Sequence, residues 1–200
     1  MKTAKIISII GHPVFHPTWM MIMLLLSGLT RFTPGNDLTF LTITFSMTCL
    51  VPALIIVMMK KWHVIKSFEM EERDDRLGPL FIMVLFLYTT LRFFNRFELF
   101  SLFSFYLTTT IVVTILAFVI TFFWKISLHS LGWGNLTACL FIMTTASIRM
   151  YLLYFIGCII ISGIVAAARL KLKSHSNAQI YTGFAMGFAT VIILYFLFLL

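Results

Sequence analysis

The stretch FSLFSFYLTTTIVVTILAFVITFFW, residues Phe100–Trp124, decides the fold class. It contains no charged side chain, and it is longer than the roughly 20 residues that a helix needs to cross about 30 Å of hydrocarbon. Inside a bilayer the backbone must satisfy its own hydrogen bonds, and a helix does so along its own length. This stretch therefore predicts a membrane-spanning α-helix.

Similar apolar stretches recur along the whole chain. The other expected spans are Pro17–Leu29, Leu38–Met59, Leu77–Phe94, Ser130–Ile148, Tyr151–Ala168 and Ala178–Leu200. The count is seven, or six if the short first stretch only lies in the membrane interface. The sequence thus predicts an all-α, polytopic transmembrane bundle of six to seven helices, forming a single integral membrane domain over residues 1–200.

The composition excludes most soluble functions. Hydrophobic residues make up 60% of the chain and charged residues 11%, with a mean hydropathy of +1.02, whereas soluble domains carry about 25% charged residues. The net charge of +8 comes without basic segments interleaved with aromatics, which argues against nucleic acid as a partner. The cysteines Cys49, Cys139 and Cys158 all lie in apolar stretches, so no disulfide framework is expected.

We expect a multi-pass protein of a bacterial inner membrane, surrounded by membrane lipids. Gly183 and Gly187 have the spacing that lets two transmembrane helices approach closely. This spacing predicts close packing within the bundle, and it leaves open a homo-oligomer formed through transmembrane helices.

Polar residues gather on one predicted membrane face. Counting crossings puts the polar stretch 60–76, the segment Lys125–His129 and the segment Arg169–His175 on the same side, together with the N-terminus. The opposite face receives Arg31, Arg92, Arg96 and Arg149. We expect the catalytic and substrate-binding residues to lie on the first of these faces. His12 and His16, which stand before Pro13 and Pro17, are expected to cap or anchor the first span.

Three short patterns on that face carry residues suited to phosphate chemistry. They are RDDRLGP at Arg73–Pro79, KISLH at Lys125–His129, and ARLKLKSHSNAQ at Ala168–Gln179. Cleavage of a phosphate ester needs cationic donors for the phosphoryl oxygens, a nucleophile, and an acid for the leaving oxygen. The planar guanidinium of Arg169 suits phosphate, and Arg73, Arg76 and Lys125 add positive charge.

Together the three patterns resemble the signature of the type 2 phosphatidic acid phosphatase superfamily, of which this chain would be a divergent member. The resemblance implies a hydrolase of a lipid phosphate or polyprenyl diphosphate that requires neither metal nor cofactor. It implies that His175 attacks phosphorus to form a phosphohistidine and that His129 protonates the leaving group. It assigns substrate binding to Arg169 and Ser127, helped by Arg76, Lys125 and Arg73.

The chain departs from that signature at several positions. Ile126 and Leu128 replace the family's Pro and Gly, and Glu69 stands where the first motif has Lys. Gln179 replaces the Asp that orients the nucleophile. Four residues after His175 on a helix, its amide oxygen would share a face with the imidazole. It is expected to fix the imidazole tautomer without offsetting positive charge.

Two alternatives remain open at this stage. A catalytically silent protein of the same fold would bind lipid phosphate or a membrane partner. A transferase would instead use magnesium held by the acidic cluster between Glu69 and Asp75, for which we favour a solvated loop with local ion pairs.

Overall fold

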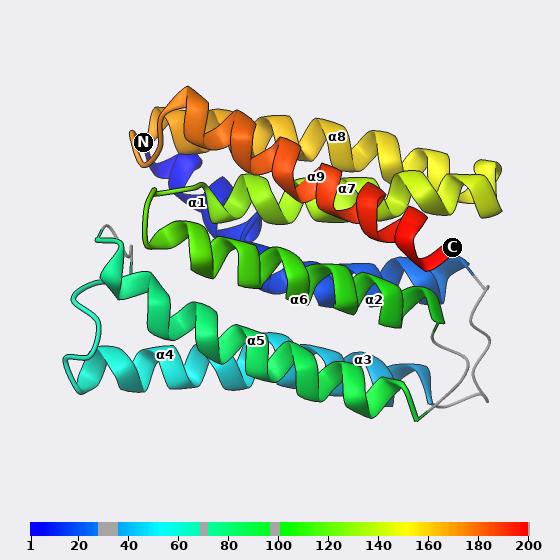
Figure 1. Ribbon diagram of the computed structural model, residues 1–200, viewed down its shortest axis with the longest axis horizontal. Coiled ribbons are helices and arrows are strands. Elements are labelled where there is room, and N and C mark those ends of the chain that lie inside the picture. Colours follow the sequence, from blue (N-terminus) through cyan, green and yellow to red (C-terminus); the bar gives the residue numbers. More distant parts are fainter. Residues whose placement is uncertain (28–35, 69–71, 97–100, 200) are drawn as a thin grey trace. The chain divides into compact units, whose positions relative to one another are not determined.

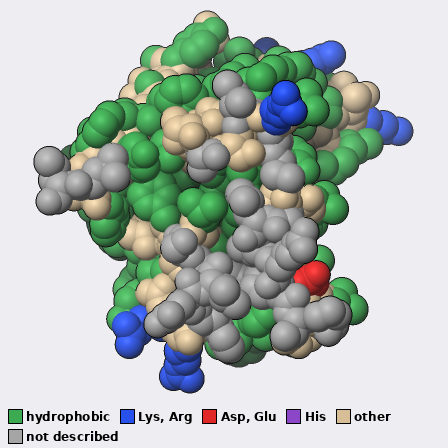
Figure 2. All heavy atoms as spheres, turned by 90° about the vertical axis from the view of Figure 1, so that its right-hand side faces the viewer, with side chains coloured by type: hydrophobic (Ala, Val, Ile, Leu, Met, Phe, Trp, Pro, Cys, Tyr) green, Lys and Arg blue, Asp and Glu red, His purple; other side chains and the backbone are tan. Residues whose placement is uncertain are grey.

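The computed structural model of the chain describes residues 1–27, 36–68, 72–96 and 101–199. Within these ranges the structure is helical and contains no strand. Six stretches are long and apolar enough to cross a membrane: Lys2–Ser27, Asp37–Lys61, Asp74–Phe94, Leu102–Thr121, Tyr151–Lys171 and Asn177–Phe198. Hydrophobic side chains also cover most of the described surface in Figure 2. The predicted all-α transmembrane architecture is confirmed.

The helix that falls outside these six is α7 (Leu128–Ala146). It is the predicted span Ser130–Ile148, and its 19 residues give a length of about 28 Å. Its polar residues His129, Asn135 and Thr137 are buried, because the neighbouring helices α8 (Ile148–Lys171) and α9 (Asn177–Leu199) pack against it. The predicted count of six to seven spans is confirmed, and the helix on which the count depends is α7 instead of the first stretch.

The first stretch begins at Lys2 rather than at the predicted Pro17. Helix α1 (Lys2–Ile10) leads through the 3-10 turn η1 (Pro13–Phe15) into α2 (His16–Ser27). The helix breaks at this point because Pro13 has no N–H to continue it. The ring Nδ1 of His12 accepts a hydrogen bond from the backbone N–H of Val14 at 3.2 Å, so His12 caps the turn as expected. His12 and His16 lie within the first stretch, not before it.

Residues 1–16 and 125–200 form one compact unit, which we call the first unit. In it α7 packs against both α8 and α9, and α1 packs against α8 (Figure 1). A Cβ added to Gly187 would lie 2.1 Å from the carbonyl oxygen of Leu131, and one added to Gly134 would lie 2.2 Å from that of Phe184. The backbones of α7 and α9 thus meet directly, and the predicted close packing at Gly183 and Gly187 is confirmed.

Residues 17–124 form the second unit. The helices here are α2 from Pro17 onward, α3 (Asp37–Phe45), the short π-helix η2 (Ser46–Leu50), α4 (Val51–Lys61), α5 (Asp74–Phe94) and α6 (Ser101–Thr121). Pro52 follows η2 and lacks the N–H that would continue the regular ladder, which accounts for the wider turn. The ring of Phe94 packs against those of Phe40 and Phe103 in the core. Because the contacts group into two units, a single domain over residues 1–200 stays a prediction.

Candidate functional site

Arg169 lies in the last turn of α8, where a Schellman motif ends the helix. The N–H of Ser174 donates to the carbonyl of Arg169 at 3.2 Å, and the N–H of Lys173 donates to that of Leu170 at 2.9 Å. Lys173 has a φ of 54°, the left-handed conformation that this motif needs. The predicted spacing of Arg169, five residues and His175 is therefore the short turn that joins α8 to α9.

The guanidinium of Arg169 points to α1. Its Nη1 donates a hydrogen bond to the hydroxyl of Ser8 at 2.8 Å. Its buried Nε has no hydrogen-bond partner among the described residues. A buried donor without an acceptor costs free energy, so this nitrogen is a candidate for contact with a ligand.

His129, at the start of α7, meets the same residue of α1. Its Nε2 lies 3.0 Å from the carbonyl oxygen of Ser8. A carbonyl can only accept, so this nitrogen carries a proton. The ring is 8% exposed and packs edge-on against His12, with 4.9 Å between the ring centroids. Arg169 and His129, predicted from two separate motifs, thus converge on Ser8.

His175 is held by Gln179 just before α9. Its Nδ1 lies 3.0 Å from the Oε1 of Gln179, which as an amide oxygen accepts. The same oxygen accepts the N–H of Ser176 at 3.1 Å, and the N–H of Gln179 donates to the hydroxyl of Ser176 at 3.3 Å. The last two bonds form a capping box. Gln179 therefore starts α9 and also holds a proton on Nδ1 of His175, which leaves the lone pair of a neutral ring on Nε2.

Ser127 serves as the N-cap of α7. Its hydroxyl accepts from the N–H of Ser130 at 3.4 Å and from the Ser130 hydroxyl at 3.1 Å. The residue is fully buried, and its own N–H donates to the carbonyl of Gln179 at 3.4 Å. Ser127 thus ties α7 to α9, and its predicted hydrogen bond to a phosphoryl oxygen stays a prediction. Lys125, two residues earlier, is half-buried.

The two remaining predicted cations belong to the second unit. Arg73 donates from Nη1 to the carbonyl oxygens of Phe122 and Phe123 at 3.3 and 3.1 Å. These carbonyls follow the C-terminus of α6, where a cation is favoured. Arg76 is buried in the first turn of α5. Arg73 therefore has a structural task, and the contact of either residue with substrate phosphate stays a prediction.

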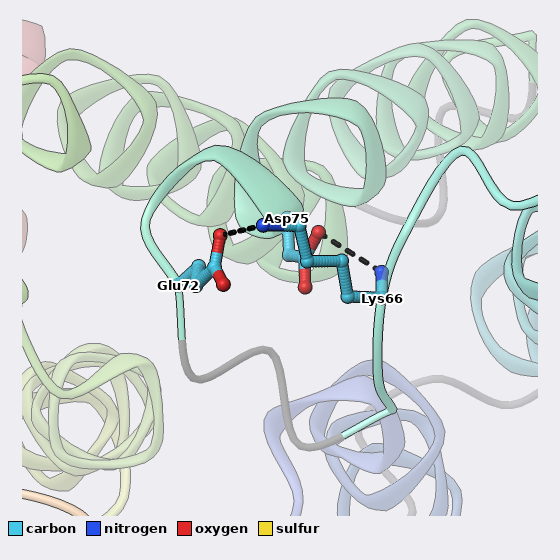
Figure 3. A network of polar contacts seen from close by, with 3 residues as sticks. All are labelled: Lys66, Glu72 and Asp75. Carbon is cyan, nitrogen blue, oxygen red and sulfur yellow. Dashed lines mark hydrogen bonds and ion pairs between the residues drawn. The ribbon is translucent and has the colours of Figure 1, made fainter.

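The acidic residues around the start of α5 form an ion pair and a hydrogen bond with Lys66 (Figure 3). Lys66 lies 2.5 Å from Glu72, and its backbone N–H donates to Oδ1 of Asp75 at 3.0 Å. The hydrogen bond that the Lys66 ammonium donates to Glu72 raises the pKa of Lys66. These contacts fit the solvated loop that we favoured over a magnesium site, while Glu69 and Glu71 lie outside the described residues.

The charges of the chain divide unevenly between the units. All seven acidic residues lie in the range 17–124. The first unit has no Asp or Glu, and its cations are Lys2, Lys5, Lys125, Arg149, Arg169, Lys171 and Lys173. No carboxylate side chain of this unit can therefore neutralise Arg169, so an anion from outside the unit is the natural counter-charge for this partly buried cation.

Sequence reasoning missed Ser8, since it lies in none of the three motifs. The feature that could have indicated it is the composition of the segment 1–16, which has two histidines and no acidic residue. The carboxylate-free first unit was also visible in the sequence, but only once its boundaries were known. Comparison of the chain with protein-family models, with curated proteins and with solved structures finds no match.

Proposed function

We propose that the chain is a membrane-embedded phosphatase that removes phosphate from a lipid phosphate or a polyprenyl diphosphate. The observation that carries the proposal is the convergence of Arg169 and His129 on Ser8. It occurs in a unit without acidic residues, so the site favours an anionic group. The resemblance of the three motifs adds the reaction type.

The reaction runs through named groups of the first unit. Arg169 binds the phosphoryl oxygens, and Nε2 of His175 attacks phosphorus while Gln179 holds the proton on Nδ1. The bond from phosphorus to the lipid oxygen breaks, and His129 gives that oxygen a proton that it has taken up at Nδ1. Burial, His12 and Arg169 lower the pKa of His129, so the negative charge of the bound phosphate has to favour this second protonation. Water then attacks the phosphohistidine, returns a proton to His129, and frees inorganic phosphate and His175.

A second candidate is a protein that binds lipid phosphate without cleaving it. It is favoured by one observation: the partner of His175 is an amide. An amide holds the tautomer but does not offset the positive charge that grows on the ring during attack. Since the first unit has no Asp or Glu, no carboxylate side chain within it takes over that task.

Phosphate release by purified protein separates these candidates. The protein in detergent is given phosphatidic acid, phosphatidylglycerophosphate or a polyprenyl diphosphate in the presence of EDTA. The proposal expects release that is lost in His175→Ala and kept in His63→Gly, a matched control in the second unit. Binding without release supports the second candidate. Phosphate release that occurs only without EDTA, and that persists in His175→Ala, contradicts the proposal.

A further inference from the structure

Ser8 occupies the centre of the site, although no motif contains it. It lies on α1, is 6% exposed, and contacts Arg169 through its hydroxyl and His129 through its carbonyl. The 2.8 Å bond from Arg169 uses one lone pair of the hydroxyl. The hydroxyl keeps its own hydrogen to donate.

That hydrogen has no acceptor in the described part of the chain. The nearest candidate is Nε2 of His129 at 3.4 Å. This nitrogen already carries a proton, which it donates to the carbonyl of Ser8, so it cannot also accept from the hydroxyl. Two buried donors therefore lack an acceptor in the described part of the chain: the O–H of Ser8 and the Nε–H of Arg169. Their side chains are hydrogen-bonded to each other.

Two adjacent hydrogen-bond donors without acceptors favour a ligand that has several acceptor atoms. A phosphoryl group offers such acceptors in its oxygens, and its negative charge suits the guanidinium. We infer that Ser8 is a substrate-binding residue whose hydroxyl donates a hydrogen bond to a phosphoryl oxygen held by Arg169. The inference rests on the proposed function and assigns to Ser8 the hydroxyl role that the motif resemblance gave to Ser127.

The fold holds α1 in the position that this role requires. A Cβ on Gly11 would lie 2.4 Å from the side chain of Val165, so α1 and α8 approach closely at this point. The indole Nε1 of Trp133 donates to the carbonyl of Gly11 at 3.0 Å and fixes α1 against α7. Gly11 stands three residues after Ser8, so both contacts fix the helical turn that presents the hydroxyl.

Phosphate affinity in Ser8→Ala tests the inference. Alanine is the best helix former, and the matched control is Ser162→Ala. Ser162 is a buried serine of α8 whose hydroxyl donates to the carbonyl of its own helix at Ile159. The dissociation constants of inorganic phosphate and of dihexanoyl phosphatidic acid are measured in detergent, and the melting temperature without ligand reports on folding.

We expect Ser8→Ala to weaken both ligands about 10-fold or more, the range for a hydrogen bond to a charged group. Ser162→Ala should bind both ligands with wild-type affinity, and its melting temperature should equal that of wild type. Should Ser8→Ala lower the melting temperature, Ser8→Cys, which keeps a donor of similar size, must bind more tightly than Ser8→Ala. Unchanged affinity in Ser8→Ala, with affinity lost in Arg169→Gln, overturns the role of Ser8 alone. Absence of phosphate binding in wild type overturns the proposed function as well.

Discussion

The Nη1 of Arg169 donates a 2.8 Å hydrogen bond to the hydroxyl of Ser8, a residue 161 positions earlier in the chain. The bond joins the end of α8 to α1 beside the protonated Nε2 of His129. A guanidinium at this depth would ordinarily meet a carboxylate, but the first unit contains none. It donates instead to a neutral hydroxyl.

Replacing Arg169 should affect phosphate binding through geometry as well as charge. Arg169→Lys keeps the charge but loses the planar set of donors, so we expect phosphate affinity to fall about 10-fold or more. Arg149→Lys, an exposed arginine in the first turn of the same helix, is the control and should bind as wild type. Titration with inorganic phosphate measures both. Equal affinity in wild type and Arg169→Lys would refute the role of the guanidinium.

Gln179 should respond to an added charge. Gln179→Glu keeps the capping box, which accepts either side chain at this position, and it supplies a carboxylate to offset charge on His175. We expect faster phosphate release from phosphatidic acid. Gln179→Asp should gain less, since its shorter side chain loses the bond to the N–H of Ser176. Gln179→Leu should release phosphate more slowly than wild type. A rate in Gln179→Glu at or below wild type contradicts the assignment of His175.

Much of the fold follows from the sequence because apolar length alone determines it. Stretches such as Leu38–Met59 and Phe100–Trp124 coincide with helices of the structure within a few residues. The first span was predicted to start at Pro17, whereas α1 precedes the break at Pro13 and extends the stretch back to Lys2. The low hydropathy of α7 could not be interpreted without its neighbours, which bury its polar residues.

The site was predictable only where its residues are close in sequence. His175 and Gln179 are four positions apart, and their predicted contact is present. His175 lies before α9 rather than on it, so the capping box of Ser176 and Gln179 brings the two side chains together. The N-cap at Ser127 and the capping box at Ser176 were not predicted, because the motif resemblance assigned Ser127 only to substrate binding. Ser8 reaches the site through packing alone, and no local pattern marks it.

The contact of α7 with α9 should tolerate no side chain at Gly187. The added carbon of Gly187→Ala would lie 2.1 Å from a backbone oxygen of α7, so the two helices must separate. We expect a loss of about 3 kcal/mol or more in the free energy of unfolding. Gly163→Ala on α8 is the control: an added carbon meets nothing within 4 Å, and helix propensity should stabilise it by up to about 1 kcal/mol. Melting in detergent gives both values, and equal effects would disprove the close approach.

The ends of α8 should lie on opposite sides of the membrane. Ser8 contacts Arg169 and Gly11 meets Val165, so α1 is antiparallel to α8 and Lys2 lies toward the end that holds Lys173. Exposed cysteines in Lys2→Cys and Lys173→Cys should label from one side with an impermeant maleimide, and Arg149→Cys from the other. The three native cysteines are buried, which keeps the background low. Labelling of Lys173→Cys and Arg149→Cys from one side would rule out a spanning α8.

A covalent phosphohistidine at His175 can be trapped, and its detection tests the proposed mechanism. Purified protein is incubated with phosphatidic acid radiolabelled at phosphorus, in EDTA, and is denatured in alkali, in which a phosphohistidine survives although acid destroys it. The account predicts alkali-stable, acid-labile label on the peptide that contains His175. The label should be absent from His175→Ala and present in the His63→Gly control. Phosphate release without labelled protein, or label that persists in His175→Ala, would contradict the account.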